Sequence, residues 1–197
     1  MELIQNTPDL SAYLAADEAI DHDHPLVREA AARLARQAED SYAYARLAFE
    51  FVRDTIPHSA DSGDLRVTWR ASDVLEQATG ICYAKSHALA ALLRAEDIPT
   101  ALCYQRLAHD DGSGHAVHGL VAVRFNGKWH RQDPRGNKPG VDAQFSLDGE
   151  RLAWVPDPES NEVDYPVLYA EPHPAVLSVL RAAPDRSYLW KTLPTEL

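Results

Sequence analysis

Residues 79–100 read TGICYAKSHALAALLRAEDIPT, and this stretch decides the fold. From residue 81 to residue 95 every amino acid forms or tolerates a helix, and neither proline nor glycine interrupts the run. The spacing therefore predicts a central helix over 81–95. Cys82, Leu89 and Leu93 fall on one face of that helix, which places the thiol in the first turn, on the side of the buried leucines. The chain then turns at residues 97–99.

The chain as a whole has the composition of a folded acidic protein. The chain has 197 residues, with 19 Lys and Arg against 30 Asp and Glu, which gives a formal net charge of −11. A hydrophobic share of 45% and a charged share of 25% suit one domain with a real core. Nucleic acid and anionic membrane surfaces are not expected as partners, because both need clustered Lys and Arg.

The sequence also predicts a cellular compartment. Residues 1–19 lack the basic flank and the unbroken apolar run of a signal peptide, and no later stretch approaches the roughly 18 apolar residues of a membrane span. Two cysteines, Cys82 and Cys103, are too few for a disulfide framework. We therefore expect a cytoplasmic protein in which both thiols are reduced.

Helices are expected before the central one. Apolar residues recur at steps of four between Pro25 and Ala38, and Asp40 can cap a second helix that follows. Residues 57–70 have the composition of a loop, after which Ser72 can cap a short helix that ends near residue 80. We expect the first two helices to pack together.

Beyond residue 99 the hydrophobic period changes to two. Strands are expected over 100–107, 116–125 and 128–133, and the chain between the last two is Asn126-Gly127, the sequence of a two-residue type I′ turn. After residue 140 the pattern weakens, with one strand expected over 151–155 and one helix over 174–183.

The predicted turn fixes the register of its hairpin. Phe125 must face Lys128, so Asp133 lies opposite Leu120, and His118 shares that face because residues 118 and 120 have the same parity. His118 and Asp133 become diagonal neighbours, about 7 to 8 Å apart at the backbone and within hydrogen-bonding reach through their side chains. Without a bulge, His115 and His130 project from the opposite face. The register thus predicts an Asp–His pair without any motif.

Cys82 is the candidate nucleophile for this pair. The positive end of the helix dipole and a neighbouring imidazolium both stabilise a thiolate in the first turn. An Asp that accepts from one imidazole nitrogen leaves the other free to act as a base. The free amide of Cys82 can supply half of an oxyanion hole. Spacing leaves the second donor open, with His58 and Trp69 as candidates.

Residues 71–133 resemble the core of the transglutaminase-like superfamily. In that family a Gly-x-Cys opens a helix that ends at a Gly-Ile-Pro-like turn, and here Cys82, His118 and Asp133 follow in the family's order. The resemblance implies a papain-like α+β fold in which Cys82 is the nucleophile, His118 the base and acid, and Asp133 the residue that orients His118. The chain departs from the pattern at Tyr83, at Asp97 in place of the usual Gly, and at Gly119-Leu120.

These elements predict a single transglutaminase-like domain over residues 1–197. Extra helices over 1–56 precede a catalytic core of about 71–133, in which the helix that carries the Cys packs on an antiparallel sheet that carries the His and the Asp. Residues 134–197 wrap around that core. Of four late aromatic residues, most are expected to pack in the core rather than line the cleft: Trp154, Tyr165, Tyr169 and Trp190.

The function expected from these residues is cysteine-dependent acyl transfer on amide or peptide bonds, through a thioester and without a cofactor. The substrate would be a peptide, a protein or a small amide, and hydrolysis is favoured over cross-linking because no calcium module or extra domain is evident. The alternatives are a non-catalytic member of the same fold that binds a peptide or a partner, and an acyltransferase that uses a carrier-bound donor. A metal site is not expected, because no Cys-x-x-Cys or His-Glu-x-x-His occurs. Cys103 is expected to be a core residue.

Overall fold

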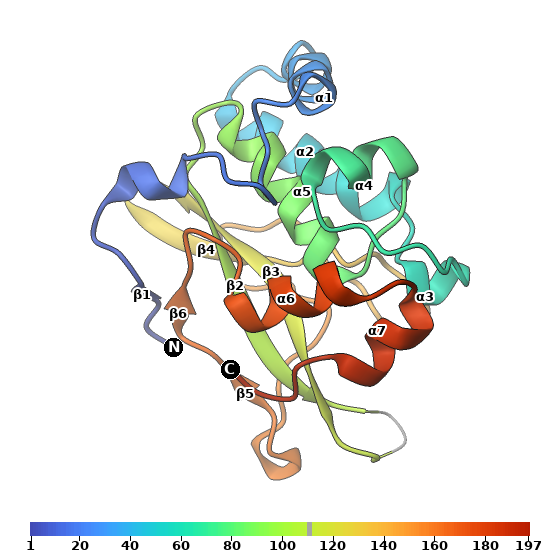
Figure 1. Cartoon of the computed structure of the whole chain (residues 1–197). Coiled ribbons are helices and arrows are strands. Elements are labelled where there is room, and N and C mark those ends of the chain that lie inside the picture. The colour runs from blue at the N-terminus through green and yellow to red at the C-terminus, as the bar shows by residue number, and fades with distance from the viewer. Residues whose placement is uncertain (110–111) are drawn as a thin grey trace.

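Helices cover one face of a curled antiparallel sheet in the computed structural model of the protein (Figure 1). The structure describes residues 1–109 and 112–197. The helices are α1 (Pro25–Ala35), α2 (Ser41–Thr55), α3 (Ser59–Ser62), α4 (Ala71–Gln77), α5 (Cys82–Arg94), α6 (Pro174–Ala182) and α7 (Arg186–Thr192), with short 3-10 helices η1 (Leu10–Tyr13) and η2 (Pro158–Ser160). The strands are β1 (Ile4–Gln5), β2 (Thr100–Ala108), β3 (His115–Phe125), β4 (Lys128–Gln132), β5 (Val163–Asp164) and β6 (Val167–Leu168).

The central helix predicted from residues 81–95 is α5, and every one of its residues is buried. It packs against β2 and β3 and against α1, α2 and α4. This enclosure leaves the helix without a face toward solvent, so its polar residues, among them Lys85, His87 and Arg94, are buried with the apolar ones. The polar side chain of Lys85 is accommodated by backbone carbonyls at the end of α2, those of Arg53 and Ile56. The predicted central helix is confirmed.

The hairpin also forms in the predicted register. The larger sheet has the order β4-β3-β2-β5, and within it Phe125 pairs with Lys128 and Val121 with Gln132. Asn126 and Gly127 both have positive φ angles, 49° and 79°, as a type I′ turn requires. Asp133 follows the last paired residue of β4 and lies at the end of the sheet where the site is built.

The N-terminal segment covers the other face of the sheet. Tyr13 is fully buried there and meets the ring of Trp129 edge-on, with 5.0 Å between centroids. Cys103 lies in the same apolar cluster and has no exposed surface, so the prediction that it is a core residue is confirmed. The two cysteines therefore lie on opposite sides of the sheet.

Long-range contacts account for the elements that differ from the sequence prediction. Residues 151–155 form no strand: the Ala153 amide instead donates to Asp133 at 3.2 Å. Ser72 is not the cap of α4, which begins one residue earlier, and both its amide and its hydroxyl bind the carboxylate of Asp21. The expected loop at 57–70 contains α3, and α7 was not predicted. Among the residues that the structure describes, no helix is both long and apolar enough to cross a membrane.

Candidate active site

Cys82 occupies the first position of α5 and lines a cleft. Ile81 precedes the helix with an extended backbone, and the Cys82 side chain is 9% exposed. The sulfur therefore remains reachable from the cleft while the rest of α5 is enclosed. At this position the positive end of the α5 dipole stabilises negative charge on the sulfur.

His118 lies on β3 and faces Cys82. Its Nε2 is 2.8 Å from Oδ2 of Asp133, and the same ring lines the cleft together with Cys82, close enough for the charge of the Cys82 sulfur to act on it. Because Nε2 is occupied by Asp133, the ring nitrogen that serves Cys82 is Nδ1. The diagonal pair expected from the hairpin register is thus present in the structure, and it is aimed at the thiol.

Gly119 permits the close approach of α5 to β3. A Cβ atom at this position would lie 2.6 Å from Cδ1 of Tyr83, far inside van der Waals contact. The Tyr83 hydroxyl in turn donates to the carbonyl oxygen of Val117, the residue before His118. Two departures from the family pattern, Tyr83 and Gly119, therefore fit each other and set the spacing between Cys82 and His118.

Asp133 is held as a carboxylate by three donors. It is fully buried, its Oδ1 accepts from the Arg135 amide at 3.0 Å, and its Oδ2 accepts from the Ala153 amide at 3.2 Å as well as from His118. Burial alone would raise the pKa of Asp133, but the imidazolium of His118 and the two amides lower it below its ordinary value. The carboxylate stays charged and fixed in direction.

The charge on Asp133 controls the state of His118. Burial would lower the pKa of His118, yet the Asp133 carboxylate and the Cys82 sulfur outweigh burial and raise this pKa to about 10. An imidazolium is therefore favoured next to Cys82 over the neutral pH range. This arrangement is the charge partner that a thiolate needs.

Two side chains that the sequence did not identify complete the wall around the pair. The Trp154 ring meets the His118 ring edge-on at 4.9 Å between centroids, and the Arg135 guanidinium lies 5.2 Å from the centre of the Trp154 ring. Arg135 is itself fixed by a bidentate contact with Asp61 of α3, one arm of which measures 2.9 Å. No periodic pattern marks Trp154 and Arg135, because they come from two separate segments outside the helices and strands.

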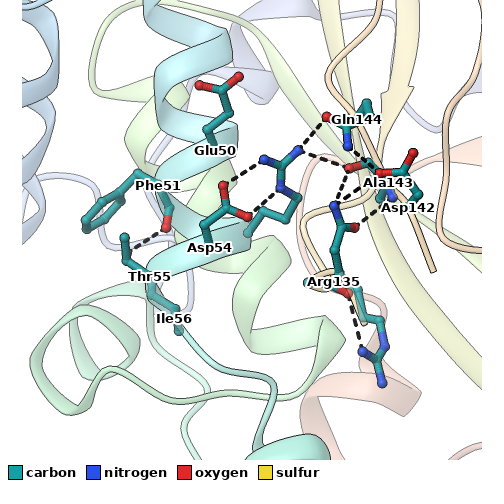
Figure 2. A network of polar contacts seen from close by, with 12 residues as sticks. Glu50, Phe51, Asp54, Thr55, Ile56, Arg135, Asp142, Ala143 and Gln144 are labelled. Atoms are coloured by element: carbon teal, nitrogen blue, oxygen red, sulfur yellow. Dashed lines mark hydrogen bonds and ion pairs between the residues drawn. The ribbon is translucent and has the colours of Figure 1, made fainter. Parts of the chain in front are cut away.

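The loop that follows Asp133 is anchored to the end of α2. The guanidinium of Arg53 lies between Asp54 of its own helix, at 2.7 Å, and the carbonyl oxygen of Ala143, at 3.0 Å. Figure 2 shows how Asp54, Ala143 and Gln144 lie in this network of polar contacts. Arg53 also donates to the side chain of Gln144 at 2.9 Å. This network fixes the Ala143–Gln144 end of the loop to α2, while Arg135 near its other end is held by Asp61.

The cleft has a volume of about 300 Å³ and a mixed lining. Cys82, His118 and Trp154 belong to that lining. It also contains apolar residues, among them Leu107, Ala116 and Trp190, and the charged side chains of Asp61, Arg135 and Lys138. Trp154 and Trp190 therefore line the cleft, contrary to the expectation of packing, whereas Tyr165 and Tyr169 pack against the core as expected.

The backbone amide of Cys82 is engaged rather than free. It donates to Nε2 of His58 at 3.1 Å, so the half oxyanion hole expected from sequence already has a side chain against it. Trp69, the other candidate for a second donor, is not among the described residues that line the cleft, and its ring lies between Arg70 and Arg181. In the described part of the chain, no three His, Cys, Asp or Glu side chains form a group that could hold a metal ion.

Comparison with known proteins agrees with this architecture. Residues 28–134 match the family model of the transglutaminase-like superfamily. A solved structure from Cytophaga hutchinsonii, described as a "Putative Cysteine Protease", is similar with a TM-score of 0.54 and 18% identity over 66% of this chain. A second solved structure, described as a TGase, gives a TM-score of 0.41 and 19% identity over 66% of this chain. The match spans 43% and 35% of the two solved chains, respectively, and no curated protein matches.

Proposed function

Because the family model covers more than half of its residues, the chain belongs to the transglutaminase-like superfamily, and we propose that it is a cysteine-dependent acyl-transfer enzyme that acts on amide or peptide bonds. The observation that carries this proposal is the line of side chains from Asp133 through His118 to Cys82, with 2.8 Å between the first two. In the proposed roles, Cys82 is the nucleophile, His118 the base and acid, and Asp133 the residue that orients His118. No cofactor is needed.

The first half of the proposed reaction forms a thioester. Nδ1 of His118 takes the thiol proton, and the Cys82 sulfur attacks the carbonyl carbon while the π electrons of the C=O bond move to oxygen. When the C=O bond re-forms, the C–N bond breaks and Nδ1–H of His118 gives its proton to the leaving amine. The acyl group is then held on Cys82.

The second half releases the acyl group. Water, or an amine, loses a proton to Nδ1 of His118 and attacks the thioester carbon, and the C–S bond breaks to return the thiolate. Throughout, Asp133 keeps the imidazole in the tautomer and direction that serve Cys82. We favour water as the acceptor, which makes the enzyme a hydrolase or peptidase.

The walls of the cleft suit a peptide or amide substrate. The volume of about 300 Å³ is at the lower end of the range of small-molecule pockets, so it holds only a short segment of chain around the reacting bond. Leu107 and Trp190 offer apolar surface, and Lys138 offers a positive charge. A peptide or amide can therefore present both apolar and polar groups to this lining.

The thioester is the species that tests the proposal. With p-nitrophenyl acetate as the probe, we expect a burst of p-nitrophenol of about one equivalent per protein molecule, because acylation of a thiolate by an activated ester outruns release of the acyl group. Mass spectrometry of peptides from quenched protein should find the acetyl group on Cys82 and not on Cys103. Added glycinamide separates the two acceptors, since a transferase forms N-acetylglycinamide and a hydrolase forms acetate.

A burst without acetyl on Cys82, or acetylation at surface lysines alone, would contradict the proposal. In that case the site would serve binding, and the cleft should be examined with peptide ligands. The matched control variant carries Cys103→Ala and should keep the burst, because this thiol is buried on the opposite side of the sheet.

A further inference from the structure

His58 lies directly against the amide of the proposed nucleophile. Its Nε2 is 3.1 Å from the backbone nitrogen of Cys82, and its ring lines the cleft although the residue is only 7% exposed. The backbone holds it there, because His58 forms a β-bridge with Gly80 and the next residue, Ser59, donates to the Gly80 carbonyl oxygen at 3.0 Å. The position of His58 relative to Cys82 is thus fixed by main-chain contacts.

The second nitrogen of the same ring also faces a backbone donor. Nδ1 of His58 is 3.3 Å from the amide nitrogen of Ala60, in the capping position of α3. A neutral imidazole has one N–H and one lone pair, so it can accept from only one of the two amides at a time. An imidazolium could accept from neither. The ring of His58 therefore has two backbone N–H groups competing for one lone pair.

The surroundings keep this ring neutral. Burial, followed by the positive charge of Arg135, lowers the pKa of His58 to about 3, while Asp61 acts weakly in the opposite direction. His58 differs in this respect from His118, which has a carboxylate partner. The competition between the amides of Cys82 and Ala60 is consequently settled by which ring nitrogen carries the single proton.

Building on the proposed function, we propose that His58 is the second donor of the oxyanion hole. In the acyl complex its Nδ1 accepts from the Ala60 amide, and its Nε2–H donates to the substrate oxygen beside the amide of Cys82. The two donor nitrogens are 3.1 Å apart, and an oxygen about 3 Å from both lies to one side of the line that joins them. Each N–H therefore has to turn from the other nitrogen toward that oxygen, which requires a rotation of the His58 ring and of the Cys82 peptide when the substrate binds.

The exchange of partners conserves hydrogen bonds around the ring. In the free site the Cys82 amide points at Nε2, which places the ring proton on Nδ1. When the substrate oxygen enters, the proton moves through solvent from Nδ1 to Nε2, the amide of Cys82 turns to the oxygen, and the amide of Ala60 gains the lone pair on Nδ1. No net proton is gained or lost, and the number of backbone amides that the ring accepts stays at one.

Two probes of the same sulfur can isolate this role. Acetylation of Cys82 by p-nitrophenyl acetate passes through an oxyanion, whereas alkylation by iodoacetamide displaces iodide from carbon and forms none. In His58→Ala we expect acetylation to slow by about 10²- to 10³-fold, the usual cost of one oxyanion donor, while alkylation of Cys82 changes little. His58→Gln, which keeps an N–H donor of similar reach, should recover most of the acetylation rate.

Each other outcome overturns the inference in a recognisable way. Acetylation that is unchanged or faster in His58→Ala would mean that the ring blocks the Cys82 amide instead of assisting it. If acetylation and alkylation slowed equally, His58 would act by stabilising the Cys82 thiolate and not the oxyanion. Circular dichroism and thermal melting check that each variant is folded, and His58→Gln keeps the test valid if His58→Ala does not fold. Failure of both probes on the unaltered chain would overturn the proposed function, and this inference with it.

Discussion

Replacement of Cys82 by alanine is expected to remove the proposed acyl transfer almost completely, by a factor on the order of 10⁴ or more, and to leave the protein folded. The sulfur atom forms the covalent bond to the acyl group in the proposed reaction, so the variant lacks the nucleophile. The structural cost is small, because Cys82 lies at the edge of the cleft and keeps some exposure, unlike the leucines of α5. The burst of p-nitrophenol and the thermal melting curve measure the two effects separately.

The second cysteine supplies the matched control. Cys103 is fully buried on β2, and burial raises the pKa of its thiol far above the ordinary value. Cys103→Ala should therefore keep the burst, while it lowers stability by the small amount that a buried sulfur contributes. Retention of the burst in Cys82→Ala, or its loss in a folded Cys103→Ala, would contradict the proposed assignment of the nucleophile.

Asp133→Asn is expected to have the next largest effect, a fall in turnover of up to about 10⁴-fold, which is the loss caused by the same replacement in a Ser-His-Asp triad. An asparagine can still accept from one of the Arg135 and Ala153 amides, so much of the local structure is kept. It cannot carry the negative charge that raises the pKa of His118. The imidazole then loses both its preferred tautomer and its charge.

The same variant has a definite signature with pH. A histidine whose pKa is raised in the folded protein stabilises it fully below the unfolded value of about 6.5, and this stabilisation is lost as the pH rises through about 10. Without Asp133, His118 should lose its proton at a lower pH. Its contribution to the free energy of unfolding and the His118-dependent reactivity of Cys82 should then both decline at a lower pH than in the wild type. Titration of His118 by NMR and turnover measured against pH give the two curves.

Asp148→Asn is the matched control for this charge change, because Asp148 is an exposed carboxylate on the same connection. It should leave both the pH profile and turnover unchanged. The role proposed for Asp133 would be wrong if Asp133→Asn kept the alkaline limit of the wild type, or if the two variants behaved alike.

Local rules were enough to predict the central helix and the hairpin. The unbroken helix formers of residues 81–95 and the two-residue turn at Asn126-Gly127 act over a few positions, and the turn fixes the register of every pair in its hairpin. The register then brings His118 and Asp133 together, because side chains two residues apart share a face of the sheet. The pairing of His118 with Asp133 therefore follows from the turn and from the alternation of side chains along the two strands.

Residues that reach the site from distant loops could not be predicted in this way. Trp154 meets His118 because Ala153 donates to Asp133, and that contact replaces the strand expected at 151–155. His58 was one of two candidates from the sequence, and only the bridge with Gly80 places it beside Cys82. Such contacts depend on how loops close in three dimensions, and a single sequence carries no periodic signal for them.

The central claim is that Cys82 and His118 form a thiolate–imidazolium pair, and the rate of alkylation by iodoacetamide tests it most directly. The rate should be followed for Cys82 and Cys103 by peptide mapping from about pH 4 to 10, which brackets the value of about 8.5 for a free thiol. We expect Cys82 to react quickly well below that value, Cys103 to stay inert in the folded protein, and Cys82 in His118→Ala to lose its advantage. A Cys82 that is inert, or that gains reactivity only near pH 8.5 with or without His118, would contradict the account.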